Sequence, residues 1–279
     1  MKDALNPPWS QLMWHAATHP GRYRRRNEDA FLLLNFDAQE VRYLGKEGQS
    51  HGMHEHFIFA VSDGIGGGVG GHHASQSALK LLVPLVSKMF HQKGLKGEVP
   101  FAELLVSFTR HIHESLLSMS RHYQECERMG ATLTLGWVHE ARLHFAHLGD
   151  SRIYLIREGQ ACRQLTEDHT LAAQRVKEGK MTPQQARRDE RAHVLTKSIG
   201  IVGRPDEPQL GNATLQLGDS LVFCTDGLSD ALPDYRIAAT LNQPPPSLAG
   251  LNPVERLIKE ALDGSGRDNM TGIVVQCLP

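Results

Sequence analysis

The chain has 279 residues, a formal net charge of −1 and a hydrophobic share of 40%. It can therefore bury a substantial core, while the balanced charge argues against a general role in binding nucleic acid. No apolar run approaches the roughly 18 residues of a membrane span, so we expect a single domain over residues 1–279 without a membrane segment.

The apolar patterns along the chain predict an α+β protein. Continuous or alternating apolar runs predict strands at residues 12–19, 30–36, 57–62, 130–138, 142–150, 153–156, 161–165, 213–217, 220–224 and 272–277. Apolar residues at helical spacing predict helices at residues 72–90, 100–123, 168–178 and 253–262. We expect loops at residues 37–56 and 242–251, and a mobile, charged flap at about 180–191. Blocks of strands around a pair of long helices favour a layered domain with helices packed outside the sheets.

Between the first two predicted strands lies an unusual charged segment that contains Arg24, Arg25, Arg26, Glu28 and Asp29. If this segment is extended, the two-residue period of a strand places Arg24, Arg26 and Glu28 on one face. Such a face could offer a cation to an anionic substrate and a carboxylate to a metal ion. The alternative is a charged hairpin that faces the solvent.

A glycine-rich turn follows the apolar strand that ends at Asp63. Gly66, Gly68 and Gly71 match the G-x-G-x-x-G fingerprint of dinucleotide-binding proteins, but no second strand ending in an acid follows about 20 residues later. A phosphate-binding P-loop is also excluded, because no Gly-Lys-Ser/Thr sequence is present. Two interpretations remain: Asp63 is a metal ligand beside a closely approaching backbone, or the segment is a plain turn.

Histidine and cysteine residues give weaker signals. His51, His54 and His56 have a ligand-like spacing, but a solvated loop explains them as well. The four cysteines are scattered, which predicts reduced thiols and neither a zinc site nor a disulfide framework. Residues 1–8 lack the apolar core of a signal peptide, and we expect a cytoplasmic protein.

Acidic residues recur at the ends of predicted strands. Six carboxylates share this placement: Glu28, Asp29, Asp63, Asp150, Asp226 and Asp268. If these strand ends meet at one edge, the carboxylates would repel one another unless cations lay among them. Such oxygen ligands suit Mg²⁺ or Mn²⁺, and two ions of this kind can activate water for attack on a phosphoryl group.

Five short motifs occur in order: Arg24-x-x-Asn27-Glu28-Asp29, Asp63-Gly-x-Gly-Gly, Gly149-Asp150-Ser-Arg, Thr225-Asp226-Gly-Leu and Arg267-Asp268-Asn-x-Thr. Together they resemble the metal-dependent protein phosphatase family of the protein phosphatase 2C type, in its compact bacterial version, from about residue 15 to 276. The resemblance implies a four-layer α-β-β-α sandwich, with two antiparallel sheets flanked by helix pairs. It also implies two tightly bound Mn²⁺ or Mg²⁺ ions, with a possible weaker third ion, at one end of the sandwich.

The resemblance assigns metal ligands by position in the motifs. Asp63 would bridge the two tightly bound ions. Glu28 and the backbone carbonyl of Gly64 would hold one of these ions, and Asp226 and Asp268 would hold the other.

Three further positions receive roles from the same resemblance. Arg24 would bind the substrate phosphate, Asp29 would orient the metal-bound water, and Asp150 would hold the third metal ion. The chain departs from some family members at Ile65, where they have a histidine proposed as general acid. The proton for the leaving group must then come from another source.

The resemblance therefore implies an enzyme that hydrolyses phosphoserine and phosphothreonine in proteins, through a water or hydroxide activated by a dinuclear centre. Two alternatives remain open: a phosphatase dedicated to one regulatory phosphoprotein in a partner-switching cascade, and a non-catalytic phosphoprotein-binding module. The second alternative requires the loss of a core ligand, and none is lost. The expected partners are phosphoproteins, namely substrates of a serine/threonine protein kinase, and we expect a monomer.

Overall fold

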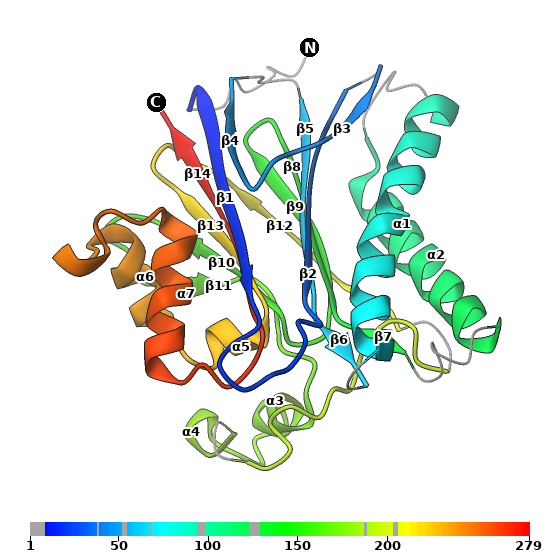
Figure 1. Cartoon of the computed structure of the whole chain (residues 1–279). Helices are drawn as coiled ribbons and strands as arrows, with labels where there is room; N and C mark the ends of the chain where they lie inside the picture. Colours follow the sequence, from blue (N-terminus) through cyan, green and yellow to red (C-terminus); the bar gives the residue numbers. More distant parts are fainter. Residues whose placement is uncertain are drawn as a thin grey trace.

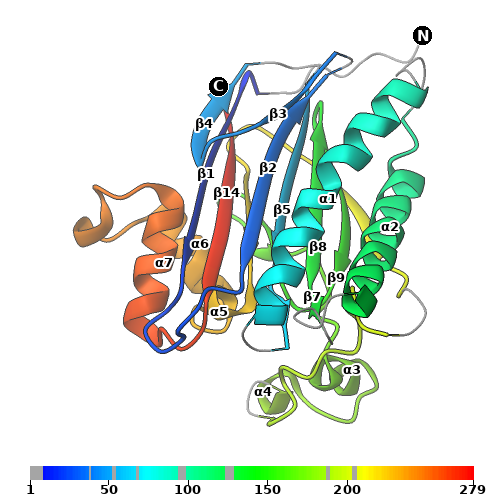
Figure 2. The ribbon, with the colours of Figure 1, turned by 45° about the vertical axis from the view of Figure 1, so that its right-hand side comes forward.

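The computed structural model of the chain describes residues 9–37, 39–51, 55–66, 69–93, 99–122, 129–186, 189–202 and 206–279. Two six-stranded antiparallel sheets lie face to face at its centre, and helices cover the outer face of each sheet (Figures 1 and 2). The expected four-layer α-β-β-α sandwich is therefore confirmed.

The strands of the two sheets come from both halves of the chain. The first sheet has the order β11-β10-β13-β14-β1-β4 and consists of β1 (Gln11–His19), β4 (Glu47–Ser50), β10 (Arg152–Ile156), β11 (Arg163–Gln164), β13 (Ser220–Cys224) and β14 (Met270–Leu278). The second sheet has the order β12-β9-β8-β5-β2-β3 and consists of β2 (Ala30–Phe36), β3 (Val41–Tyr43), β5 (His56–Ser62), β8 (Leu133–His139), β9 (Arg142–Leu148) and β12 (Gln209–Thr214). Two short strands, β6 (Gly64–Ile65) and β7 (Gly130–Ala131), pair with each other.

Each sheet has its own pair of covering helices. The second sheet is covered by α1 (Val69–Lys93) and α2 (Phe101–His122), and the first by α6 (Asp234–Asn242) and α7 (Pro253–Gly264). The short elements are α3 (Leu171–Lys177), α4 (Pro183–Ala186), α5 (Asp226–Ser229) and the 3₁₀ turn η2 (Pro246–Leu248). In both views α3, α4 and α5 lie toward the same end of the sandwich. In the described part of the chain, every helix is too short or too polar to cross a bilayer.

Strand β5 shows how the sequence builds the layers. All of its residues are buried, because both faces of this central strand are covered. Side chains alternate between the faces: Ile58 and Ala60 pack against the α1–α2 layer, whereas Phe59 and Val61 pack between the sheets. Asp63 follows this strand directly, so its carboxylate is held at the end of a buried strand.

Several regions differ from the expectations above. Residues 37–56, expected as a loop, contain β3 and β4, which lie at sheet edges where no apolar pattern is needed. The strand expected at 213–217 lies at Gln209–Thr214, and most of its side chains are at least partly exposed. Helix α6 buries only Ile237 and Thr240, too few residues for its sequence to show a helical pattern.

The arginine-rich segment is not extended, so the strand alternation assumed for it was wrong. Residues 21–23 form a turn and residues 25–26 form a bend. The side chain of Asn269, just before β14, holds this loop by donating to the carbonyls of Pro20 (2.9 Å) and Arg26 (3.0 Å). These contacts are tertiary, and local sequence periodicity does not reveal them.

Candidate metal centre

Carboxylates from both sheets gather at one end of the sandwich. Asp63 and Asp150 follow strands β5 and β9 of the second sheet, whereas Asp226 follows β13 and Asp268 precedes β14 in the first sheet. Asp29 lies just before β2. Asp63 interacts electrostatically with Asp29, Asp150 and Asp226, and Asp29 also interacts with Asp268. The structure thus brings together strand ends that the sequence only suggested would meet.

The segment after β13, which carries Asp226, lies very close to the segment before β14, which carries Asp268. A Cβ atom at Gly227 would collide with the carbonyl oxygen of Asn269 and would lie 3.1 Å from the Cβ of Asp268. The glycine after Asp226 therefore lets this segment lie directly against the segment before β14.

A second close approach occurs at Gly71, near the start of α1. A Cβ atom there would lie 3.0 Å from the carbonyl oxygen of Gly64 and would collide with Oε2 of Glu28. The Glu28 carboxylate and the Gly64 carbonyl therefore line the same small space. The backbone N–H of Glu28 donates to Oδ1 of Asn269 (2.8 Å), which ties this space to the segment before β14.

Thr132 holds the backbone of Asp63 from two sides. The N–H of Asp63 donates to Oγ1 of Thr132 (2.8 Å), and the N–H of Thr132 donates to the carbonyl of Asp63 (2.9 Å). Oγ1 of Thr132 also lies 2.9 Å from Oγ of Ser151, the residue after Asp150. A buried pair of hydroxyl groups thus links the backbone positions of two strand-end carboxylates.

Burial makes the gathered carboxylates costly to ionise together. Burial, and then the neighbouring carboxylates, raise the pKa of Asp63 and of Asp150 well above the usual range of an aspartate. Burial also raises the pKa of Asp29 to about 7, although Oγ1 of Thr225 donates to its Oδ2 at 2.7 Å. Cations near these groups would allow all of them to be ionised at neutral pH.

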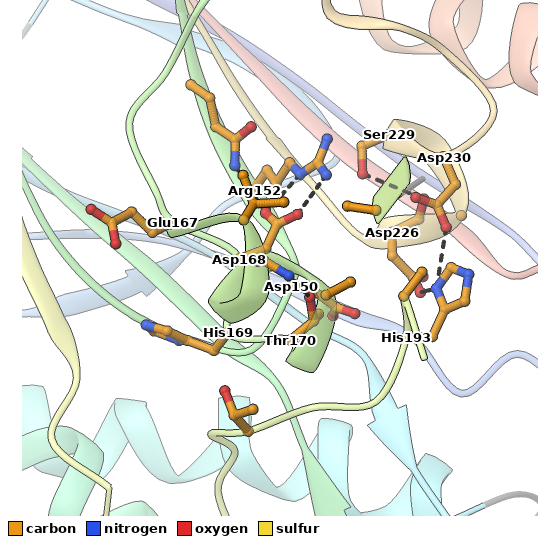
Figure 3. A pocket seen from close by; sticks show the side chains of 18 of the residues that line it. Asp150, Arg152, Glu167, Asp168, His169, Thr170, His193, Asp226, Ser229 and Asp230 are labelled. Atoms are coloured by element: carbon orange, nitrogen blue, oxygen red, sulfur yellow. Dashed lines mark hydrogen bonds and ion pairs between the residues drawn. The ribbon is translucent and has the colours of Figure 1, made fainter. Parts of the chain in front are cut away.

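His193, which the sequence analysis did not select, also reaches this cluster (Figure 3). Its Nδ1 lies 3.8 Å from Oδ2 of Asp226 and 3.4 Å from Oδ2 of Asp230. The ionic contact with Asp226, and then the charge of Asp230, raise the pKa of His193 to about 9. Burial acts to raise the pKa of Asp226, yet the contact with His193 lowers it overall.

The sequence carried a signal for only one of these two additional residues. Asp230 lies four residues after Asp226, and this spacing places both side chains on one face of a helical turn. His193 lies outside every motif and outside every apolar pattern, so its place beside Asp226 follows from tertiary structure alone.

Arg24 lies at a pocket of about 1410 Å³ that Asp150, Asp226 and Asp268 also line. Its Nη2 donates to Oδ2 of Asp268 at 2.5 Å, and more than half of its side chain is exposed. Ile65 occupies the position at which some members of the resembled family have a histidine. It pairs with β7 and is half-buried.

The residues of this cluster fit a divalent metal ion. Oδ1 of Asp226 and Oδ1 of Asp29 are buried and have no hydrogen-bond partner in the described part of the chain. The space beside Gly71 exposes a carboxylate and a carbonyl to each other without an intervening side chain. Carboxylate and carbonyl oxygens are the ligands that Mg²⁺ and Mn²⁺ prefer.

The histidine cluster of the sequence analysis lies elsewhere. His56 is buried in β5, and its Nδ1 accepts a hydrogen bond from Nε1 of Trp137 (3.1 Å). His51 is exposed, and His54 lies outside the described residues.

A family model described as protein phosphatase 2C matches residues 48–262 of this chain. The chain belongs to the protein phosphatase 2C family. Protein phosphatase PhpP of Streptococcus pneumoniae is 33% identical to it over 262 residues, which are 92% of this chain and 94% of PhpP. Serine/threonine protein phosphatase PstP of Mycobacterium tuberculosis is 30% identical over 247 residues, which are 87% of this chain and 45% of PstP. The chain therefore spans about half the length of this second relative.

A solved structure shows the same architecture as this member of the protein phosphatase 2C family. It is the catalytic domain of serine/threonine protein phosphatase PstP in complex with two manganese ions. The TM-score is 0.71 at 28% identity, and the match covers 96% of this chain and 99% of that one.

In this protein phosphatase 2C chain, all of the predicted site residues lie at one end of the sandwich: Arg24, Glu28, Asp29, Asp63, Gly64, Asp150, Asp226 and Asp268. Their individual roles stay predictions. The expected flap at 180–191 contains α4, whose residues are not buried, while residues 187–188 lie outside the described part. Pro183 and Ala186 of α4 line the pocket.

Proposed function

We propose that this chain is a metal-dependent protein phosphatase that hydrolyses phosphoserine and phosphothreonine. The observation that supports the proposal is the meeting of Glu28, Asp63, Asp226 and Asp268 at one end of a protein phosphatase 2C sandwich. The relative PstP is a serine/threonine protein phosphatase, and a PstP catalytic domain binds two manganese ions. These findings favour the same substrate class and Mn²⁺ or Mg²⁺ as cofactor.

The proposed ligands divide between two tightly held ions. Asp63 would be shared by both ions, Glu28 and the Gly64 carbonyl would hold one of them, and Asp226 and Asp268 would hold the other. Asp150 would hold a weaker third ion. When bound, the ions supply positive charge that polarises the phosphoryl group and a water molecule.

Arg24 binds the phosphate of the substrate in this proposal. A planar guanidinium can donate two parallel hydrogen bonds to phosphate oxygens, and Arg24 lies exposed at the pocket. Its present acceptor is Oδ2 of Asp268. A cation bound at that carboxylate would leave Arg24 free to donate to an incoming phosphate.

Asp29 orients the attacking water without itself being one of the proposed metal ligands. Its Oδ2 accepts from Thr225, which fixes the carboxylate, whereas its Oδ1 has no partner in the described part of the chain. The free oxygen is an acceptor for a hydrogen bond from water. Ile65 cannot donate a proton, so the leaving serine or threonine oxygen takes its proton from another group.

We further propose that residues 1–279 fold as a single domain that acts as a monomer in the cytoplasm. Its partners would be phosphoproteins produced by a serine/threonine protein kinase. A phosphatase dedicated to one regulatory phosphoprotein would ignore generic phosphopeptides, and a binding module would bind them without hydrolysis. A peptide panel therefore separates these alternatives from the main proposal.

The direct test of the proposed activity is phosphate release from a phosphothreonine peptide, measured with Mn²⁺ and again after chelation. We expect turnover with Mn²⁺, none after exhaustive chelation, and recovery when Mn²⁺ is returned. Undiminished turnover after the metal has been removed would contradict the proposed mechanism.

A further inference from the structure

We propose that His193 supplies a nitrogen ligand to a divalent cation held also by Asp150 and Asp226, and that this ligand makes the site select Mn²⁺ over Mg²⁺. The inference rests on the proposed function for the metal-binding roles of the two carboxylates. It adds a residue that belongs to none of the sequence motifs.

The geometry of the three side chains suits one ion. One ligand atom from each of Asp150, His193 and Asp226 lies within 4.8 Å of the other two. Ligands on opposite sides of an ion are about 4.2 Å apart when each bond is about 2.1 Å, and adjacent ligands are closer. Small side-chain rotations therefore bring all three atoms to one ion, with Nδ1 of His193 facing the carboxylates (Figure 3).

The two carboxylates are buried beside other acidic groups. Asp150 is only 8% exposed, and its carboxylate lies among those of Asp226, Asp168 and Asp230. Oδ1 of Asp226 is also buried without a hydrogen-bond partner in the described residues. Buried carboxylates of this kind are unfavourable unless a positive charge lies beside them.

The backbone holds His193 and Asp150 near each other through one shared segment. The N–H of Leu171 donates to the carbonyl of Val194 (2.9 Å), the residue after His193. The N–H of His169 donates to the carbonyl of Gly149 (2.7 Å), the residue before Asp150. The segment at the start of α3 thus binds the backbone of both Val194 and Gly149. These hydrogen bonds hold the imidazole of His193 near the carboxylate of Asp150.

The mixed ligand set determines which metal the site prefers. Neutral imidazole nitrogen binds first-row transition ions well, so Mn²⁺ would displace the proton that His193 otherwise carries. Mg²⁺ favours oxygen ligands and retains water. The competing explanation is a plain ion pair of His193 with Asp226 and Asp230, which involves no metal–nitrogen bond.

The first measurement is calorimetric titration of the full chain with Mn²⁺ and, separately, with Mg²⁺. We compare the wild type with His193→Ala and with His111→Ala, which removes an exposed histidine on α2. His193 is itself largely exposed, so its removal leaves the core intact. We expect His193→Ala to weaken the weakest Mn²⁺ site by about tenfold or more while Mg²⁺ binding and the tight Mn²⁺ sites stay unchanged. His111→Ala should match the wild type for both metals.

The second measurement is pulsed electron paramagnetic resonance of bound Mn²⁺, which detects coupling to a ¹⁴N nucleus. We expect this coupling in the wild type and its loss in His193→Ala. Equal weak-site affinity in both proteins, or a nitrogen signal that persists in the variant, would overturn the inference while leaving the phosphatase proposal standing. A wild type that binds no Mn²⁺ at all would overturn both.

Discussion

Burial shifts the pKa values of the strand-end carboxylates and of the buried histidines of the second sheet in opposite directions. Burial raises the pKa of Asp63 and Asp150 well above the usual range, and it lowers the pKa of His56 and His147 to about 3. In both groups burial favours the uncharged form. The two groups differ in how their polar atoms are satisfied.

Hydrogen-bond partners separate the two groups. Nδ1 of His147 lies 2.9 Å from Oγ1 of Thr134, and its Nε2 lies 3.1 Å from the carbonyl of Glu167, so the neutral ring is fully satisfied. Oδ1 of Asp226 and Oδ1 of Asp29 have no such partner in the described part of the chain. Of the groups compared, the histidine with complete local partners serves the fold, whereas the carboxylates with an unpartnered buried oxygen are suited to binding a ligand.

Asp63→Asn should produce the largest effect, because it removes the charge shared by both proposed ions and keeps the size of the side chain. We expect kcat for a phosphothreonine peptide to fall by about 10³-fold, the scale of several kcal/mol of lost charge stabilisation. Thermal melting of the metal-free variant should show no loss of stability, because burial already disfavours the ionised form of Asp63 and asparagine is neutral. A variant that keeps half of the wild-type rate would show that the assignment of Asp63 is wrong.

Lowering the pH should reveal how the buried histidine His147 affects the stability of the fold. The pKa of His147 is lowered from 6.5 to about 3, so it stays neutral in the folded protein while the unfolded chain takes up a proton below pH 6.5. Stability is therefore lost as pH falls from about 6.5 toward 3, by ~2 kcal/mol at pH 5 for this one group.

Urea unfolding at pH 7 and pH 5 measures this contribution. The loss of unfolding free energy between the two pH values should be smaller in His147→Gln than in the wild type. His111→Gln, at an exposed position of α2, is the matched control and should behave as the wild type does. An unchanged loss in His147→Gln would place the titrating group elsewhere.

Arg24→Lys should have a more moderate effect, confined to substrate binding. Lysine cannot reproduce the paired hydrogen bonds of a guanidinium, so we expect KM for a phosphopeptide to rise by roughly tenfold. Arg25→Lys and Arg26→Lys should stay within about twofold, as exposed charges usually do. Steady-state kinetics on the three variants show which arginine binds the substrate phosphate. A damaging Arg26→Lys beside a harmless Arg24→Lys would assign the phosphate contact to Arg26.

Asp29→Asn should give the smallest effect, seen in the metal-free protein. The pKa of Asp29 is raised from 3.8 to about 7, so the folded state retains a proton that the unfolded chain releases, and stability is lost as pH rises from about 4 to 7. Asparagine avoids this cost but weakens the contact with Thr225, so we expect a net gain in Tm of about 2–4 °C at pH 8. The gain should vanish near pH 4. An equal gain at both pH values would contradict the electrostatic explanation.

Local patterns predicted the layers of this fold, and tertiary contacts account for what they missed. The strand at residues 30–36 is found with the predicted bounds, because an apolar run there lies between charged segments. The edge strands β3 and β4 could not be predicted, since exposed edges carry no apolar alternation.

The same distinction applies to the site. Asp63 and Asp226 could be selected from the sequence because each follows a buried strand and precedes a glycine, which is a local pattern. The choice between Arg24 and Arg26 could not be made from alternation, since the loop that carries them is bent by its contacts with Asn269. His193 reaches the carboxylates only through the packing of the segment after α4.

The central claim is that the strand-end carboxylates bind divalent ions, and anomalous diffraction from crystals soaked in Mn²⁺ tests it most directly. We predict two strong anomalous peaks among Glu28, Asp63, Asp226 and Asp268, with Asp63 contacting both. A weaker third peak should lie between Asp150 and His193. The absence of any peak in this cluster, in a protein that hydrolyses a phosphopeptide at the same Mn²⁺ concentration, would contradict the account.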